Sequence, residues 1–197
     1  MACPRRFLGA LKAGCRVGLV AAALLSAVLC VTGSAAAAVG SAPTEYQVKA
    51  VFVYNFSRFV AWPASAFASA NQPFVIGILG DDPFGSHLDE AVQGEHVDSH
   101  PLVVRRFTDV DHIGDCQILF IDRSAAAHLD LILAKLDHHS TLTVTDAQDA
   151  SLHGVMIQFE TLDQRIRLRI NADSARAAGL TISAPLLQLA QIVRTED

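Results

Sequence analysis

Between residues 44 and 63 the hydrophobic positions follow the spacing of a helix. Apolar side chains recur every three or four residues, at Val48, Val51, Phe52, Phe56 and Phe59. Thr44 followed by Gln47 is a capping-box pattern at the start of this run, and Pro63 ends it. The stretch therefore predicts an amphipathic helix. Asn55 falls on its apolar stripe, where a buried amide would need a hydrogen-bond partner.

Downstream, short apolar runs alternate with helical patterns. The expected strands cover residues 74–80, 102–107, 116–121 and 141–144, and the expected helices cover residues 83–93 and 124–136. Alternation at this spacing indicates βαβ units, in which a parallel sheet is covered by helices on both faces.

From residue 155 the period of the pattern changes to two. Apolar residues alternate with polar ones over residues 155–160 and again over residues 165–170, with a short turn between them. This alternation predicts an antiparallel hairpin whose polar face carries Arg165, Arg167 and Arg169. A last helix is expected over residues 183–193. The predicted fold class is therefore α/β, a single domain with a mixed, mostly parallel sheet, helices on both faces and a late antiparallel hairpin.

Residues 1–38 have the pattern of a signal peptide, which leaves residues 39–197 as the folded domain. Four cations precede an apolar core at Val17–Val31, and small residues follow at Ser34–Ala38. Cleavage is expected near Ala36–Val39, which places the mature protein in the periplasm. An uncleaved membrane anchor is the alternative, because the apolar run continues to Val39.

Removal of the leader changes the charge and the cysteine content. Four of the 15 Lys and Arg residues lie in the leader, and all 20 Asp and Glu residues lie beyond it, so the mature net charge is −9. Such an acidic chain is a poor match for nucleic acid or anionic lipid. Only Cys116 remains in the mature chain, so no internal disulfide can form, and a buried free thiol is expected.

Three predicted strands end in acidic residues, at Asp82, Asp122 and Asp146. Ligands of open parallel sheets bind beyond the carboxyl ends of the strands, so these acids could hold a metal or accept a phosphoryl group. The mature chain, however, has only Lys49 and Lys135, both on predicted helices, whereas a phosphoryl site needs a lysine after a late strand. We therefore interpret the three acids as turn or N-cap residues. The mature chain also lacks the common catalytic motifs, and we predict neither an enzyme nor a cofactor.

Four segments of the chain resemble one known family. They are YNFSRFVAWP, FVIGILGDDPFG, DCQILFID and AGLTISAPLLQLAQIV, and they occur in the order found in the YfiR family, over about Tyr46 to Val193. The resemblance implies a periplasmic protein that binds the sensor region of an inner-membrane diguanylate cyclase and represses it, which lowers cyclic-di-GMP. It also implies a homodimer and, in some systems, an outer-membrane lipoprotein as a second partner. The usual Gly-Gly-Met of the family is Gly154-Val155-Met156 here.

Residues that could contact a partner are chosen by chemistry and position. They are Tyr54, Asn55, Arg58 and Trp62 in and after the first helix, Asp82 and Phe84 after a strand, and Arg165, Arg167 and Arg169 on the hairpin. Aromatic residues and arginine are the usual anchors of protein interfaces. Trp62 could instead cap the core, and the arginine row could be a solvated strand face.

Two other functions remain open on this sequence. A small ligand could bind in the crevice formed by Asp82–Phe84, Asp122, Arg123 and Asp146, and a metal-dependent hydrolase is a third hypothesis. All eight histidines lie in the mature chain, among them the adjacent His138 and His139. Because imidazoles titrate near pH ~6.5, these histidines could make the stability of the protein respond to mild acid.

Overall fold

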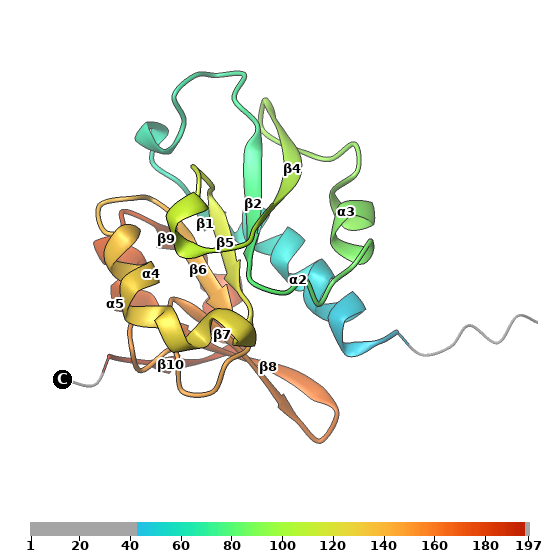
Figure 1. Ribbon diagram of the computed structural model, residues 1–197, viewed down its shortest axis with the longest axis vertical. Coiled ribbons are helices and arrows are strands. Elements are labelled where there is room, and N and C mark those ends of the chain that lie inside the picture. The colour runs from blue at the N-terminus through green and yellow to red at the C-terminus, as the bar shows by residue number, and fades with distance from the viewer. Residues whose placement is uncertain (1–42, 196–197) are drawn as a thin grey trace, which may run out of the picture. The chain divides into compact units, whose positions relative to one another are not determined.

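The computed structural model describes residues 43–195, and these residues contain an eight-stranded sheet (Figure 1). The strand order is β10-β8-β7-β6-β5-β2-β4-β3. The strands are β2 (Phe74–Leu79), β3 (His96–Val97), β4 (His100–Phe107), β5 (Ile118–Ile121), β6 (Leu142–Thr145), β7 (Ile157–Leu162), β8 (Arg165–Asn171) and β10 (Ala190–Val193). The predicted strands are thus present, together with the short β3 and the terminal β10.

Most pairs in the sheet are parallel. β2 pairs with β4 and β5, β5 with β6, and β6 with β7, all in parallel register. β7 and β8 form the antiparallel hairpin, in which Glu160 lies opposite Arg167. The predicted class, a mixed and mostly parallel sheet with a late hairpin, is confirmed.

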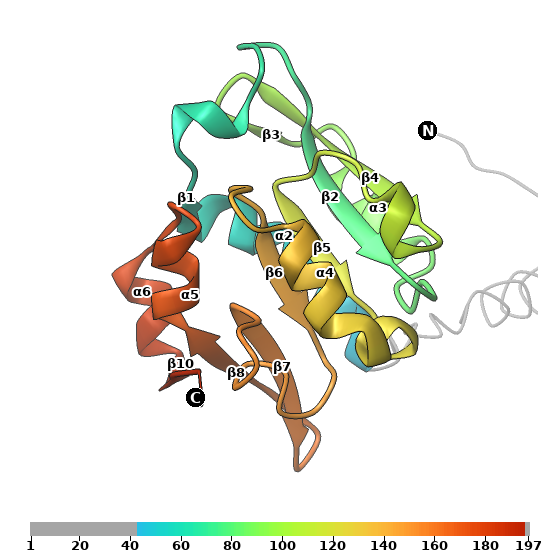
Figure 2. The same cartoon turned by 60° about the vertical axis from the view of Figure 1, so that its left-hand side comes forward.

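Helices cover both faces of this sheet (Figure 2). Helices α2 (Glu45–Phe59) and α3 (His87–Val92) pack on the face that carries Ile76, Phe120 and Val144. Helix α4 (Leu129–Lys135), which follows a 3-10 helix at Arg123–His128, packs on the opposite face. The two faces bury separate apolar clusters because successive side chains of a strand point to opposite sides.

Helix α2 begins as the sequence predicts, but it buries a different face. The Thr44 side chain accepts a hydrogen bond from the Gln47 amide, and the Gln47 side chain accepts one from the Thr44 amide, which completes the capping box. The fully buried positions are Lys49, Ala50, Val53, Phe56 and Ser57. Of the predicted stripe only Phe56 is buried, while Val51 is 51% and Phe59 is 40% exposed. The predicted stripe is therefore wrong at Val51 and Phe59, while Val48 and Phe52 are partly buried and Phe52 packs against the core. The buried face is rotated away from Val51 and Phe59 and includes Lys49.

The predicted helix over residues 183–193 is present only in its first half. The segment forms a short helix, α6 (Ala184–Gln188), and then strand β10, which pairs in parallel with β8. Open hydrogen-bonding groups on the edge of β8 are satisfied by β10, and this tertiary pairing outweighs the helical periodicity.

A small second sheet connects α2 to the C-terminal part of the chain. β1 (Val60–Ala61) pairs with β9 (Thr181–Ile182), which follows helix α5 (Ala172–Ala177). The Ser183 amide also donates to the carbonyl of Phe59. These bonds place α6 beside the end of α2.

Two local features complete the fold. Gly154 has a φ of 100°, a conformation that glycine adopts without strain, and the following Val155 is fully buried.

Within residues 43–195, no helix has the length and apolar character needed to cross a membrane.

Candidate functional site

An apolar surface lies between α2 and α6, and we call it the α2–α6 surface. It consists of Phe52, Asn55 and Phe59 of α2 together with Pro185 and Leu189, and the exposed Val51 borders it one turn before Asn55. Val51, Asn55 and Phe59 are four residues apart along α2 and so share one side of the helix. Leu189 is 74% exposed. A pocket of about 210 Å³ opens here between the two helices, so this surface combines exposed apolar area with a hollow that a side chain could enter.

The opposite flank of α2 carries a polar cluster. Tyr54 Oη donates to a carboxylate oxygen of Glu95 at 2.7 Å, and an Arg58 guanidinium nitrogen donates to the same oxygen at 2.8 Å. The guanidinium also lies 5.1 Å from the centre of the Tyr54 ring. Desolvation and then the bond to Glu95 raise the pKa of Tyr54. Both predicted partner residues are therefore already paired with each other and with Glu95.

Trp62 lies at the junction between α2 and the sheet. Its ring packs edge-on against Phe74, with centroids 4.9 Å apart, and its Nε1 donates to the Gln117 carbonyl at 3.1 Å. One side of the ring borders a second hollow of about 570 Å³, which Arg58 and Phe67 also line.

The predicted residues after β2 lie apart from these surfaces. Asp82 accepts a hydrogen bond from the Phe84 amide and pairs with Arg106 at 2.7 Å. This is the turn role expected for Asp82. Phe84 is only 1% exposed and contacts the rings of Tyr46 and Phe120. Its side chain belongs to the core and lacks the exposure that contact with a partner requires.

The hairpin arginines do not form one continuous row. Arg165 and Arg167 are exposed, but the Arg169 side chain is 13% exposed and pairs with Glu160 at 3.2 Å and Asp149 at 3.5 Å. Only the two outer arginines are thus available for contact with another molecule.

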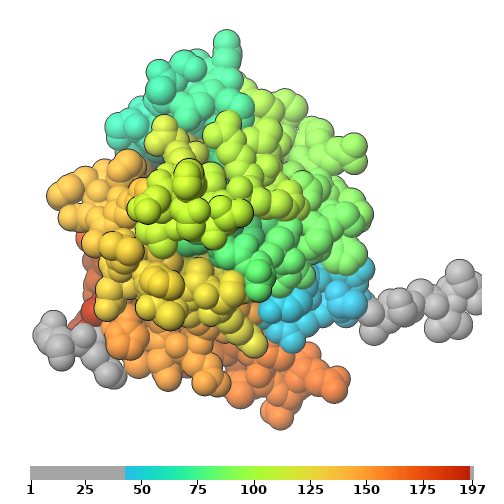
Figure 3. All heavy atoms as spheres, viewed as in Figure 1, coloured from blue at the N-terminus to red at the C-terminus, as the bar shows by residue number. Residues whose placement is uncertain are grey.

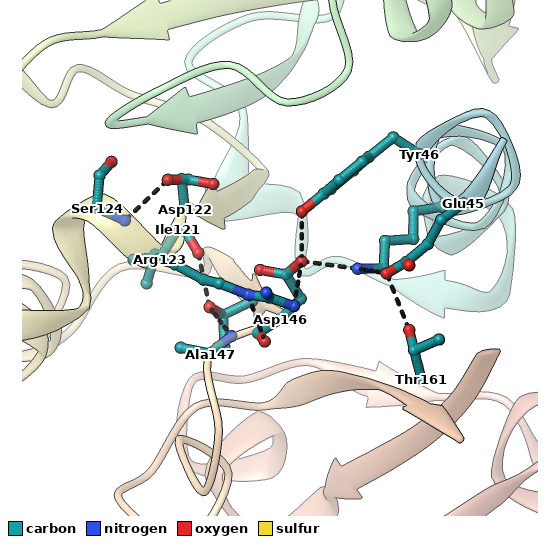
Figure 4. A network of polar contacts seen from close by, with 11 residues as sticks. Glu45, Tyr46, Ile121, Asp122, Arg123, Ser124, Asp146, Ala147 and Thr161 are labelled. Atoms are coloured by element: carbon teal, nitrogen blue, oxygen red, sulfur yellow. Dashed lines mark hydrogen bonds and ion pairs between the residues drawn. The ribbon is translucent and has the colours of Figure 1, made fainter. Parts of the chain in front are cut away.

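A buried polar network lies at the carboxyl ends of β5 and β6 (Figure 4). Lys49 Nζ lies 2.7 Å from Asp146 Oδ2, and both side chains are 0% exposed. Tyr46 Oη donates to the same oxygen at 2.9 Å, and an Arg123 guanidinium nitrogen lies 3.2 Å from it. Glu45 lies one turn before Lys49 in α2 and forms an i,i+4 ion pair with it. The network therefore joins α2 to the strand ends across the sheet edge.

The charges in this network stabilise each other. Burial alone would raise the pKa of the Asp146 carboxyl, but Lys49, Tyr46 and Arg123 together hold that pKa below its usual range. Desolvation, followed by the bond to Asp146, raises the pKa of Tyr46 to about 12. The hydrogen bond from Lys49 lowers the pKa of Glu45. The arrangement is a neutralised ionic cluster with Asp146 as its acceptor.

This geometry corrects the expectation for one of the three strand-end acids. Asp122 caps the 3-10 helix by accepting from the Ser124 amide, as predicted, but Asp146 is a buried ion-pair partner of Lys49. A signal was present in the sequence, because Lys49 shares a helix face with Val53 and Phe56, and a lysine on a buried face needs a carboxylate.

The free cysteine and the possible metal ligands remain to be described. Cys116 is a free, buried cysteine, and burial raises the pKa of its thiol to about 12. Among the residues that the structure describes, His, Cys, Asp and Glu side chains nowhere form a group of three or more that could hold a metal ion.

The fold and these sites define a single-domain α/β protein with a mixed sheet, an exposed apolar surface and a buried ionic cluster. Residues 46–191 match the family described as YfiR/HmsC-like, and the chain belongs to this family. The family is regulatory rather than catalytic and is associated with periplasmic control of diguanylate cyclase signalling. A comparison with curated proteins found no match.

Proposed function

We propose that this protein binds the periplasmic sensor region of an inner-membrane diguanylate cyclase and represses the enzyme, which lowers cyclic-di-GMP. Membership of the YfiR/HmsC-like family supports this proposal. Repression requires tighter binding to the inactive conformation of the sensor than to the active one, since a ligand that binds both equally shifts nothing.

The exposed α2–α6 surface is the observation that supports this proposal most directly. Its central residues are apolar or aromatic, and Asn55 is their one polar neighbour in the pocket lining. Exposed apolar patches on soluble proteins mark contact sites, and aromatic side chains that fill pockets provide much of the binding energy. We assign Phe52, Phe59 and Leu189 to the centre of the contact, and the exposed Arg165 and Arg167 to electrostatic steering of an acidic partner.

The remaining parts of the proposal concern location and assembly. Residues 1–38 act as a cleaved signal peptide, so that the mature chain reaches the periplasm. A second copy of the chain and an outer-membrane lipoprotein are further partners, and the lipoprotein would relieve repression by sequestering the regulator. Mass spectrometry of the periplasmic fraction tests the first point, because a mature N-terminus near Ala36–Val39 is expected.

A binding experiment tests the surface. Leu189→Glu and Val51→Glu place a carboxylate on the α2–α6 surface and at its border, at side chains that are 74% and 51% exposed, so the fold should tolerate both. Each should weaken binding to the purified periplasmic region of the cyclase by about 30-fold, the size of a hot-spot loss of ~2 kcal/mol. Leu131→Glu, at a side chain 58% exposed on α4, is the matched control and should bind as wild type.

The cellular consequence can be measured separately. Deletion of the gene should raise cyclic-di-GMP and biofilm formation, and the Leu189→Glu variant should fail to restore the wild-type level. Unchanged cyclic-di-GMP on deletion would contradict repression. Equal binding by Leu189→Glu and Leu131→Glu would move the contact to another surface.

A further inference from the structure

Near the turn of the β7–β8 hairpin, β8 has one edge that no other strand covers. β10 pairs with β8 only along residues 168–171, whereas β7 pairs with β8 from Arg165 onward. Among the residues that the structure describes, residues 165–167 therefore have a neighbouring strand on one side alone, and we call them the β8 edge. In Figure 3 the hairpin, in orange, projects at the lower edge of the molecule beside the start of α2, where Thr161 donates to Glu45.

The geometry of the turn decides which backbone groups this edge presents. The two turn residues, 163 and 164, both have positive φ, and the hairpin closes at the pair Leu162 and Arg165. In a hairpin with a two-residue turn the closing pair exchanges its backbone hydrogen bonds, and bonded and non-bonded pairs then alternate along the strands. The N–H and C=O of Ile166 therefore point away from β7.

The described part of the chain supplies no partner for these two groups of Ile166. Beyond the start of β10, the next amide in line is that of Leu189, and it donates instead to the Leu186 carbonyl at the end of α6. β7 holds this part of β8 extended on its other side. An unpaired strand edge that is already extended can accept an extended segment of another chain.

The side chains on the β8 edge determine the charge of such a segment. Arg165 and Arg167 lie on the same side of β8 and are exposed, and Glu160, which is opposite Arg167, pairs with Arg169 instead. Opposite charges on neighbouring strands stabilise their pairing, and like charges destabilise it. Two copies of this chain paired through the β8 edge would place arginine against arginine, so the edge fits an acidic partner and not a second copy.

The other side of β8 favours an apolar residue in the middle of the segment. Ile166 alternates with the two arginines and packs with the apolar core under α2. A partner residue opposite Ile166 would direct its side chain to this same side. It would also continue the line of β10, which begins directly after the exposed Leu189 of the α2–α6 surface.

We propose that the β8 edge binds an extended partner segment with the pattern acidic–apolar–acidic. The central residue bonds to the N–H and C=O of Ile166, as in an antiparallel pair, and the two carboxylates pair with Arg165 and Arg167. The central side chain extends the apolar contact of the α2–α6 surface. Because it names the form of the segment that a cyclase sensor would present, this binding mode rests on the proposed function.

Capped peptides test the β8 edge on the full domain without a cyclase. The probe is acetyl-Thr-Glu-Val-Glu-Thr-amide, titrated at neutral pH and low salt into protein labelled for nuclear magnetic resonance. Saturable shifts of the Ile166 and Arg167 amide signals are expected, with slower hydrogen exchange at Ile166. Two matched peptides should not bind at the same concentrations: one has Lys in place of both Glu residues, and one has an N-methyl group on Val, which removes the donor to the Ile166 carbonyl. Equal binding of all three peptides, or shifts that lie elsewhere on the protein, would overturn the proposal.

Charge reversal on the protein gives a second test. Arg165→Glu combined with Arg167→Glu should weaken binding of the glutamate peptide by about tenfold, the size of two partly exposed ion pairs, and should allow the lysine peptide to bind. Such an exchange of preference cannot result from unfolding. Arg105→Glu, at an exposed position on β4, is the matched control and should bind as wild type. A double variant that keeps the wild-type preference would contradict pairing at this edge.

Failure here can be told apart from failure of the proposed function. If the glutamate peptide does not bind, strand addition is wrong, while repression through the α2–α6 surface stands on the Leu189→Glu experiment. If Leu189→Glu binds the cyclase as wild type does, the α2–α6 contact is wrong, while the peptide result still decides the role of the β8 edge.

Discussion

The inner and outer sides of α2 are made of similar residues, yet they have opposite surroundings. The inner side buries Val53 and Phe56 and includes a charged residue, Lys49, which is 0% exposed. The outer side exposes Val51 and Phe59 although both are apolar. The difference shows that hydrophobicity alone does not choose the buried side of this helix. The choice depends on Asp146, which is 97 residues away in sequence and gives Lys49 a partner.

The largest loss of stability is expected when the buried ion pair on the inner side of α2 is broken. Lys49→Met leaves Asp146 without its closest cation, and loss of one partner of a buried pair costs about 3–5 kcal/mol in the free energy of unfolding. Urea denaturation measures this loss. Lys135→Met, at the exposed lysine of α4, is the control and should cost less than about 1 kcal/mol. A double variant with Asp146→Leu should recover part of the loss, and a cost below that of the control would refute the importance of the pair.

Acid should reduce the stability that the carboxylates on the inner side of α2 contribute, in a defined range of pH. The folded-state pKa of Asp146 is lower than its usual value, so its contribution is present above the unfolded-state pKa, near ~3.9, and is lost as pH falls through the folded-state pKa. Glu45 acts in the same direction. The free energy of unfolding should therefore fall below about pH 4, by up to ~1.4 kcal/mol per pH unit for each proton bound.

Denaturation of wild type and Asp146→Asn across this range separates the carboxylates from the histidines. The two proteins should differ in slope below about pH 4. A loss concentrated between about pH 5 and about pH 7.5 in both proteins would instead support the histidine hypothesis.

The N-terminal cap at Thr44 should stabilise helix α2 as a whole. Thr44→Ala removes the acceptor for the Gln47 amide, and loss of such a cap costs about 1 kcal/mol. Amide hydrogen exchange should increase in the first turn of α2. Thr108→Ala, at an exposed turn, should change stability by less than about 0.5 kcal/mol. A Thr44→Ala protein as stable as wild type would mean that packing alone fixes this end of the helix.

The smallest change in stability is expected on the outer side. Val51→Gln should alter the free energy of unfolding by less than about 0.5 kcal/mol, because this side chain is half exposed. The same substitution at Val53, which is 0% exposed, buries an amide and should cost more than about 2 kcal/mol. Thermal unfolding compares the two variants. Similar losses at both positions would mean that the outer side is covered in solution, as in a homodimer.

Local signals in the sequence were sufficient for much of the fold. The capping box of α2, the apolar runs of β2 and β5, and the alternation in β7 and β8 depend on neighbouring residues, and the structure confirms each of them. The helix prediction for residues 183–193 failed in its second half. There the helical spacing competes with an open strand edge on β8, which only the assembled sheet reveals.

The candidate sites were less predictable, because they depend on contacts between distant segments. Asn55 was placed on the buried stripe, but it borders the partly open pocket with Leu189, which α6 brings beside α2. Asp146 resembled a turn residue because its partner Lys49 belongs to another element. Buried charges of this kind can be suspected from a lone lysine on an apolar helix, but the partner cannot be chosen among several acids without the fold.

The position of Cys116 has a practical consequence for following this molecule in solution. The thiol lies two residues before the central strand β5 and is 5% exposed, and burial raises its pKa to about 12. Alkylating reagents should therefore spare it while the sheet is intact. Its rate of labelling would then report transient opening of the sheet centre. Within residues 43–195, dyes attached to newly introduced surface thiols would therefore remain site-specific without replacement of Cys116.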